Sequence, residues 1–280
     1  MTKATADILH IVLTRFNLPS KGRERKLRQS SAWLDERFTL FESVCLPSMA
    51  AQTSQDFLWL VFFDSQTSDA HQARAKNMVK AHKNIRLIWL RGSLHSAINS
   101  IIDEVAEKQT KTLITTRLDN DDALNKNFIH HIHRIQSTIP INESRIVNFD
   151  NGIVFSNGRA YEHRDTSNAF TTLVEPFSSN NNTIWKKQHT RLSELADIIN
   201  IEQPAMWLQV IHNRNISNRV RGYRVNNQVV AQNFSTDLTP LPEEKNLPIK
   251  IENVILYPLR CFKEWGRGKL KLAYQLFRSY

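Results

Sequence analysis

The stretch Leu113-Ile-Thr-Thr-Arg-Leu-Asp-Asn-Asp-Asp-Ala-Leu124 decides the fold and places the candidate site. Its first half is apolar and β-branched, which is typical of a buried strand. The strand ends in three carboxylates within four residues, Asp119, Asp121 and Asp122. Carboxylates this close repel one another unless water, a shifted pKa or a hard divalent cation relieves the repulsion. Because α/β proteins bind ligands at the carboxyl ends of their strands, the pattern indicates a metal site that holds the phosphates of a nucleotide.

The acidic run has a simpler interpretation as well. Asp and Asn favour turns and helix N-caps, so residues 119–125 are equally typical of a connection into the next helix. Short acidic motifs also occur often by chance. The motif alone does not separate a metal site from a turn and cap, and the rest of the chain has to decide.

Composition describes a basic globular protein. The chain has 280 residues, 41% of them hydrophobic, a formal net charge of +10 and a pI near 9.7. The charge favours an anionic partner, which includes nucleic acid, a nucleotide or an acidic membrane surface. No apolar run approaches the ~18 residues of a membrane-spanning helix. We therefore expect a cytoplasmic protein, either soluble or peripheral at the inner face of the membrane.

Strands and helices alternate in the first part of the chain. Apolar runs predict strands at Ile8–Thr14, Phe57–Phe63 and Ile85–Leu90, with helices at Asp69–His82 and Ser96–Glu107 between and after them. This order predicts an α/β fold with a Rossmann-like, mostly parallel sheet flanked by helices. Arg15 and Asp64 follow two of these strands, so we expect them to line the same crevice as the acids.

The rest of the chain predicts a smaller antiparallel part. A helix is expected at Asn125–Thr138, with three solvated histidines, and a helix broken near Pro47 lies upstream at Trp33–Met49. Later expectations are a hairpin turn at 156–158, a loop at 171–182, a helix at Thr190–Asn200 and an apolar element at Pro204–His212.

The chain divides by these patterns into three segments. Residues 1–125 are the expected nucleotide-binding half and residues 126–235 the second half of one domain. Residues 236–280 are the expected linker and basic amphipathic tail, which suits either an anionic membrane surface or packing against the body.

Several segments resemble glycosyltransferases. Pro47 to Phe57 followed by Leu60 to Asp69 resembles the opening of family 2 enzymes, and Leu118 to Leu124 resembles their DxD motif. More narrowly, the chain is similar over most of residues 8–230 to the rhamnosyltransferase family of bacterial surface-polysaccharide clusters. The segments that carry this similarity are Thr14 to Phe16, Thr116 to Asp122, Trp207 to His212 and Asn215 to Asn218.

The resemblance implies a GT-A fold, a nucleotide-diphosphate-sugar donor and Mn²⁺ or Mg²⁺ as cofactor. It also implies that residues 1–125 are the nucleotide-sugar-binding half of the domain and residues 126–235 the acceptor-binding half. By similarity, Asp64 would hold the nucleoside base, Asp119 the ribose or sugar side, and Asp121 the metal. Arg15 and Arg117 would contact the same donor from the strand ends. The expected reaction is transfer of a sugar, with rhamnose favoured, to a glycan or lipid-linked acceptor of the bacterial envelope.

The resemblance also points to a basic loop that covers the diphosphate in many GT-A enzymes. His212 matches a place that adds a metal ligand, with Arg214, Arg219 and Arg221 as candidate phosphate clamps. A core histidine beside Trp207 is an equally good interpretation of His212.

The catalytic base is where the sequence departs from the family. Inverting family 2 enzymes carry an acidic pair, often Glu-Asp, after the DxD motif, and this chain has none at that place. The base must deprotonate the acceptor hydroxyl. The available acids are Glu175, Asp197 and Glu202, of which we favour Glu202.

Two other functions deserve comparison. Nucleotidyltransferases that make activated sugars share related folds, but they begin with a Gly-rich phosphate loop, and Thr14 to Pro19 contains no glycine. A basic RNA-binding module is compatible with the charge, yet the chain has no RNP, KH or dsRBD pattern. We expect no nucleic-acid partner.

Overall fold

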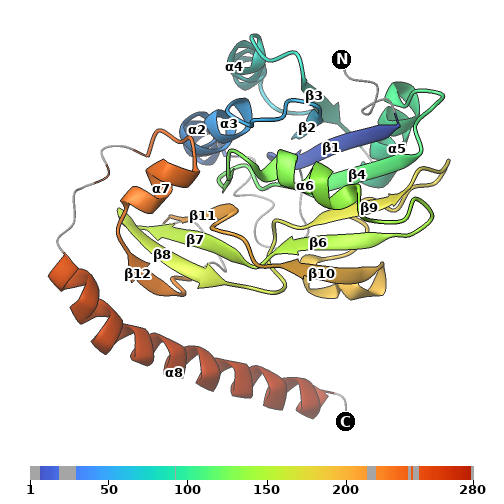
Figure 1. Cartoon of the computed structure of the whole chain (residues 1–280). Helices are drawn as coiled ribbons and strands as arrows, with labels where there is room; N and C mark the ends of the chain where they lie inside the picture. Colours follow the sequence, from blue (N-terminus) through green and yellow to red (C-terminus); the bar gives the residue numbers. More distant parts are fainter. Residues whose placement is uncertain are drawn as a thin grey trace.

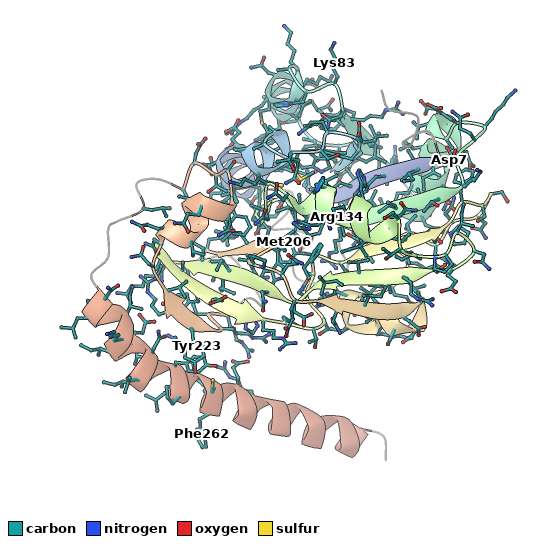
Figure 2. The ribbon with its side chains drawn as sticks, viewed as in Figure 1. Asp7, Lys83, Arg134, Met206, Tyr223 and Phe262 are labelled. Atoms are coloured by element: carbon teal, nitrogen blue, oxygen red, sulfur yellow. The ribbon has the colours of Figure 1, made fainter. Side chains whose placement is uncertain are left out.

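The computed structural model describes residues 7–18, 30–91, 93–212, 219–238, 241 and 246–278. Two β-sheets lie next to each other, with helices on both faces of the first sheet and the long helix α8 running beneath the second sheet (Figure 1). Side chains fill the space between the sheets and the helices, as around Met206 in Figure 2. No helix within the described ranges is long and apolar enough to cross a membrane.

The first sheet has seven strands in the order β10-β6-β9-β4-β1-β2-β3. β4, β1, β2 and β3 are parallel, and β9 is antiparallel to both of its neighbours. The strands are β1 (Ile8–Arg15), β2 (Leu58–Asp64), β3 (Ile85–Leu90), β4 (Thr112–Arg117), β6 (Arg145–Phe149), β9 (Thr172–Pro176) and β10 (Asp197–Ile201). The predicted α/β fold with a mostly parallel sheet is confirmed.

The sequence of β2 shows why this sheet lies inside the protein. Trp59, Val61 and Phe63 belong to one hydrophobic core, whereas Leu60 and Phe62 belong to another. Because successive side chains of a strand point to opposite faces, a continuous apolar run requires cover on both faces. The cover includes α4 (Asp69–Val79), α5 (Leu94–Val105) and α6 (Phe128–Gln136).

The second sheet has the order β12-β8-β7-β11-β5. Its strands are β5 (Ala123–Leu124), β7 (Asn151–Ser156), β8 (Arg159–Arg164), β11 (Trp207–Ile211) and β12 (Tyr223–Val225). The predicted hairpin turn joins β7 and β8, with Asn157 and Gly158 at φ 49° and 72°. β5 begins directly after the acidic run, so one connection leads from the first sheet through Asp119–Asp122 into the second.

Three expectations about elements were wrong. The segment expected as a loop from residue 171 contains β9, which pairs with both β4 and β6. The helix expected at Thr190–Asn200 is a short 3-10 helix, η2 (His189–Glu194), followed by β10. Pro47 does not break the upstream helix, because it lies in the first turn of α3, where a proline needs no amide hydrogen. The elements of that segment are α2 (Ser31–Leu40), η1 (Phe41–Cys45) and α3 (Leu46–Ala50).

The C-terminal part joins the second sheet from outside. α7 (Gln228–Asn233) packs in the core of that sheet through Val230, and α8 (Asn246–Arg278) is one helix despite Pro258. α8 is held to β12 by Asn253, whose side chain accepts from Arg224 N at 2.7 Å and donates to Arg224 O at 2.8 Å. Gly222 precedes this contact at φ 90°, and a Cβ there would lie 2.0 Å from the Glu162 carbonyl oxygen. Only glycine fits this approach.

Candidate active site

The carboxyl ends of β4, β1 and β2 form one continuous edge. Leu118 N donates to Leu13 O at 3.1 Å, and the Asn120 side chain donates to Phe16 O at 3.0 Å. On the other side of β1, Asp64 N donates to Asn17 Oδ1 at 3.0 Å. These bonds hold the acidic run beside the end of β2, so the strand ends that the sequence selected are brought together.

Asp121 is the centre of a buried ion-pair cluster on this edge. Its Oδ2 atom contacts the Arg37 guanidinium and lies 3.0 Å from His212 Nε2. Burial alone would raise the pKa of Asp121, but the His212 hydrogen bond and the Arg37 charge outweigh it and hold the pKa below its ordinary value. Asp121 is therefore an anion held between two nitrogen donors.

Arg37 is a site residue that the sequence analysis missed. It comes from α2, where its guanidinium lies 5.0 Å from the Trp33 ring centroid and donates to Asn120 Oδ1 at 3.4 Å. Its contact with Asp121 joins residues 84 positions apart. Spacing along the sequence cannot predict a contact between residues this far apart. The signal in the sequence was that Arg37 lies on an otherwise apolar face of the predicted helix.

Asp122 fixes the position of the second sheet. It is buried, and its Oδ1 atom accepts from Val210 N at 2.9 Å. Burial and the nearby charges of Asp121 and Asp119 raise its pKa well above the ordinary value. Val210 lies two residues before His212, so its hydrogen bond to Asp122 fixes the position of the His212 imidazole at the end of β11. Asp122 does not cap the next helix, because Asn125 Oδ1 accepts the Asn127 amide there.

Asp119 and Arg117 form the more open part of the site. Arg117 Nη2 lies 3.3 Å from Asp119 Oδ2, and the Asp119 side chain is 42% exposed. Arg117 Nε is a buried donor for which no acceptor is found among the described residues. Such buried orphan donors are rare, and one at a strand end fits a missing ligand.

His189 and Asp165 lie beside this open part. Burial lowers the pKa of His189, as does the positive charge of Arg117, while Asp119 and Asp165 oppose the shift. Asp165 follows β8, and its Oδ1 atom accepts from Ser167 N at 2.9 Å. The second sheet therefore adds a carboxylate that, like Asp119, lies close enough to His189 to affect its pKa.

Arg15 and Asp64 lie at the ends of β1 and β2 as expected. The Arg15 guanidinium stacks 4.7 Å from the Trp185 ring centroid. Asp64 is buried, and its Oδ1 atom accepts from Gln66 N at 2.9 Å. Asn17 joins the two strand ends further, because its amide nitrogen donates to Thr67 Oγ1 at 3.0 Å.

The three candidate bases differ in their surroundings. Glu175 is buried and accepts backbone hydrogen bonds from Asn182 and Thr183, which makes it a structural carboxylate. The Asp197 side chain is 88% exposed at the edge strand. Glu202 follows β10, which runs in the same direction as β4, so it lies at the same edge, about three strand spacings or roughly 14 Å away.

Glu202 is linked to a buried carboxylate. Arg164 Nη2 lies 2.6 Å from Glu202 Oε1 and 3.1 Å from Asp150 Oδ2. Asp150 also accepts from Asn148 Nδ2 at 2.9 Å. The Glu202 side chain is 65% exposed, and its ion pair with Arg164 holds it at the carboxyl edge of the sheet.

The predicted phosphate clamps are only partly placed. Arg214 lies outside the described residues. Arg221 Nη2 lies 3.6 Å from Glu264 of α8, and Arg219 Nη1 lies 3.2 Å from the same carboxylate. In this structure both described arginines bind α8, whereas Arg37 and His212 supply the nitrogen atoms at Asp121.

The described side chains supply only two ligand atoms for a divalent cation, so a bound donor would have to supply the others. Among the described residues, no three His, Cys, Asp or Glu side chains converge on a common metal position. Asp121 Oδ2 and His212 Nε2 nevertheless lie 3.0 Å apart, about the separation of adjacent ligand atoms that are each ~2.1 Å from one octahedral cation. A carboxylate and an imidazole suit Mn²⁺, and phosphate oxygens would have to complete the set.

A mostly parallel sheet that gathers carboxylates and arginines at the ends of its central strands, joined to a smaller sheet, is the arrangement that the motifs predict. The sequence matches the model of the family described as "Putative rhamnosyl transferase" over residues 9–224. The chain belongs to this family. The resemblance noted from its motifs is thereby confirmed.

The solved structures that match this chain share little sequence with it. The TarS fragment of S. aureus bound to UDP-GlcNAc is 13% identical, with a TM-score of 0.44, over 76% of this chain and 62% of that one. The inositol-1-phosphate CTP transferase of T. maritima is 8% identical, with a TM-score of 0.36, over 75% of this chain and 92% of that one. This chain spans about three fifths of the TarS fragments it matches. No curated protein matches it.

Proposed function

We propose that this glycosyltransferase moves a sugar, with rhamnose favoured, from a nucleotide-diphosphate donor to a hydroxyl of a glycan or lipid-linked acceptor of the bacterial envelope. The transfer takes place in the cytoplasm and inverts the anomeric centre. The observation that carries the proposal is Asp121, a buried anion at the carboxyl edge that is flanked by Arg37 and His212. Family membership and the orphan donor Arg117 Nε support it.

The site suits a leaving group that gains negative charge. As the bond to the sugar breaks, the nucleoside diphosphate becomes more anionic, and fixed cations stabilise that charge as it develops. Arg37, His212 and Arg117 are the described nitrogen donors nearest the acidic run. Asp121 and Asp119 hold these donors in place, and Asp64 at the end of β2 is the proposed partner of the nucleoside base.

Mn²⁺ or Mg²⁺ is part of the proposal, with Asp121 and His212 as its protein ligands. The cation would add a Lewis acid at the diphosphate. Arg37 contacts the same carboxylate oxygen, so a bound cation would compete with the guanidinium for Asp121. Arg37 would then be available to bind the diphosphate.

For the catalytic base we propose Glu202, as the sequence favours, and add Asp165 as the alternative that the structure brings forward. Glu202 is held at the edge by Arg164, and Asp165 lies near His189, whose pKa Asp119 also affects. Both are carboxylates on the acceptor side of the acidic run.

The test is a thermal-shift screen of the full chain with nucleoside diphosphates, nucleotide sugars and nucleoside triphosphates, with and without Mn²⁺. A ligand that binds the native state at 100 times its Kd stabilises it by about 2.7 kcal/mol. We expect a Mn²⁺-dependent shift with one nucleoside diphosphate and its sugar. A shift with a triphosphate, together with pyrophosphate release from a sugar phosphate, would instead favour a nucleotidyltransferase.

The matched variants are Asp121→Asn at the site and Asp103→Asn on the exposed face of α5. The first is expected to lose the nucleotide-dependent shift and sugar transfer, and the second to keep both. Transfer by Asp121→Asn at the rate of the unchanged protein would overturn the proposed site. The absence of a shift with every nucleotide would count against the function itself.

A further inference from the structure

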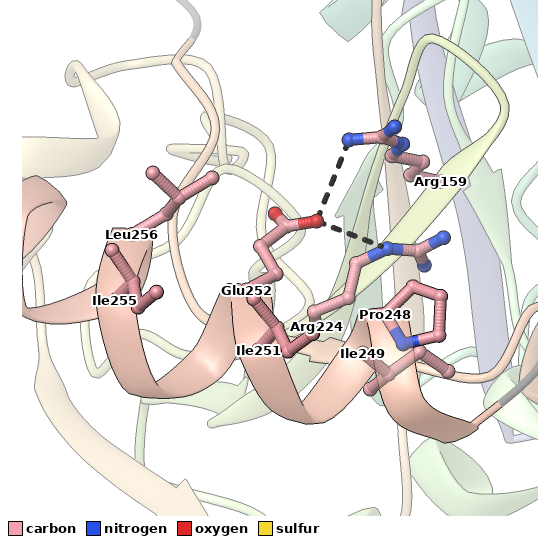
Figure 3. A pocket seen from close by; sticks show the side chains of 8 residues that line it. All are labelled: Arg159, Arg224, Pro248, Ile249, Ile251, Glu252, Ile255 and Leu256. Atoms are coloured by element: carbon pink, nitrogen blue, oxygen red, sulfur yellow. Dashed lines mark hydrogen bonds and ion pairs between the residues drawn. The ribbon is translucent and has the colours of Figure 1, made fainter.

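Helix α8 has two faces of different character. Toward the body it carries polar groups with partners, because Glu252 lies 2.8 Å from Arg260, 3.5 Å from Arg159 and 3.6 Å from Arg224. Tyr257 stacks on Tyr223 with ring centroids 3.8 Å apart. Figure 3 shows Glu252 reaching from the helix toward Arg159 and Arg224. These contacts fix which side of α8 faces the protein.

The opposite side carries a row of exposed apolar residues over more than four turns. We call it the outer row; it consists of Leu247, Ile251, Val254, Ile255, Leu259 and Phe262. Val254 is 75% exposed and Leu259 60% exposed. In Figure 2 the labelled Phe262 points away from the body. Single exposed apolar residues are ordinary, but a continuous row of this length marks an interaction surface.

The charges around the outer row identify its partner. Residues 246–278 contain seven basic and two acidic residues, a net of +5. Both acids, Glu252 and Glu264, are bound to arginines, so neither belongs to the outer row. By the helical period Lys250 and Lys263 lie on opposite flanks of the row, and both are exposed. The surface is thus an apolar strip between two lines of cations.

We propose that the outer row of α8 docks the protein on an anionic lipid bilayer, with the helix lying in the plane of the interface. Apolar side chains enter the acyl region while Lys250 and Lys263 contact lipid phosphates. A second copy of this chain fits less well, because two such helices facing each other would bring lysine against lysine with no acid to pair them. The inference does not depend on the transferase chemistry.

The test is sedimentation of the full-length protein with vesicles of phosphatidylcholine alone and of phosphatidylcholine with phosphatidylglycerol. We expect binding to the anionic vesicles that weakens with salt. The Val254→Ser/Leu259→Ser variant should bind at least roughly tenfold less, because both side chains lose apolar area. Lys250→Gln/Lys263→Gln should lose roughly fivefold per charge on anionic vesicles only.

The matched control is Ile141→Ser, an apolar residue with 56% exposure between α6 and β6. It should bind vesicles like the unchanged protein, and all variants should keep their Tm because the substituted side chains are exposed. Equal sedimentation of the outer-row variant and the control would overturn the proposal. So would a dimer in analytical ultracentrifugation that the outer-row variant converts to a monomer without any effect on vesicle binding. Nucleotide-dependent thermal shifts of the same variants separate this result from the fate of the proposed function.

Discussion

At the scale of single residues, the coupling between Arg37 and Asp121 is the contact that most directly tests the site. Both side chains are largely buried, at 12% and 9% exposure. Arg37→Gln removes a charge from a buried carboxylate, so we expect a loss of about 1.5–3 kcal/mol in the free energy of unfolding. Arg37→Gln/Asp121→Asn should recover part of that loss, because the buried anion is gone as well. Urea unfolding of the two single variants and the double variant measures the coupling, and strictly additive losses would contradict it.

The catalytic base is a second question at this scale. Loss of a general base lowers kcat by about 10²–10⁴-fold and leaves donor binding intact. We expect this from Glu202→Gln, or from Asp165→Asn if the acceptor approaches over the second sheet. Asp197→Asn, at 88% exposure, serves as the comparison. Transfer rates with saturating donor decide between the two candidates, and full rates for both variants would show that neither carboxylate is the base.

The site residues differ in how far sequence alone could locate them. Asp64, Asp119 and Asp121 each follow an apolar run that predicts a strand. Because parallel strands end at the same edge of a sheet, the sequence could place these three residues at one edge. His212 was suggested by resemblance, and its neighbour Asp121 is 91 positions away. Arg37 was missed because its role depends on how α2 packs, which is a property of tertiary structure.

At the scale of elements, the wrong assignments have a common physical cause. Leu192, Leu195 and Ile199 recur at helical spacing, which is why a helix was expected at Thr190–Asn200. The edge of β6 offers a parallel partner, and residues 197–201 pair with it. β9 likewise forms because it can pair with β4 on one side and with β6 on the other. Pairing between distant segments overrides local periodicity in both cases.

A histidine pair joins β1 to α6 and also differs from expectation. His133 was expected to be solvated, yet its Nε2 atom lies 3.0 Å from Nδ1 of the buried His10, whose Nε2 lies 2.9 Å from Thr116 Oγ1. Burial, and then the charge of the partner, lower the pKa of His10 well below its ordinary value. Burial also lowers the pKa of His133.

The sign of the resulting pH dependence follows from linkage. Because the native pKa values lie below those of the unfolded chain, the unfolded state binds more protons as the pH falls below about 6.5. Stability should be complete above that pH and decline below it. Urea unfolding between pH 7.5 and 5 checks this, and His133→Asn should flatten the slope. A slope that is the same in the variant would mean that other groups cause it.

At the scale of the whole molecule, the acidic run and α8 belong to different sheets. The acidic run lies at the carboxyl ends of the central strands of the first sheet, and α8 packs against the second sheet. The described site residues lie between Arg15 and His212, whereas α8 is anchored to β8 and β12 by Glu252. Burial alone would raise the pKa of Glu252, but hydrogen bonds from Arg260 and Tyr161 and the charges of Arg260 and Arg159 hold it below its ordinary value. Glu252→Gln should therefore lower the Tm by several degrees, at about 2–4 °C for each kcal/mol lost in a protein of this size. The nucleotide-dependent increase in Tm should stay the same, because no described contact links Glu252 to the acidic run. Differential scanning calorimetry with and without the nucleotide measures both quantities. If Glu252→Gln abolished the nucleotide effect, the two sheets would have to act as one cooperative site, and the docking helix would then control donor binding.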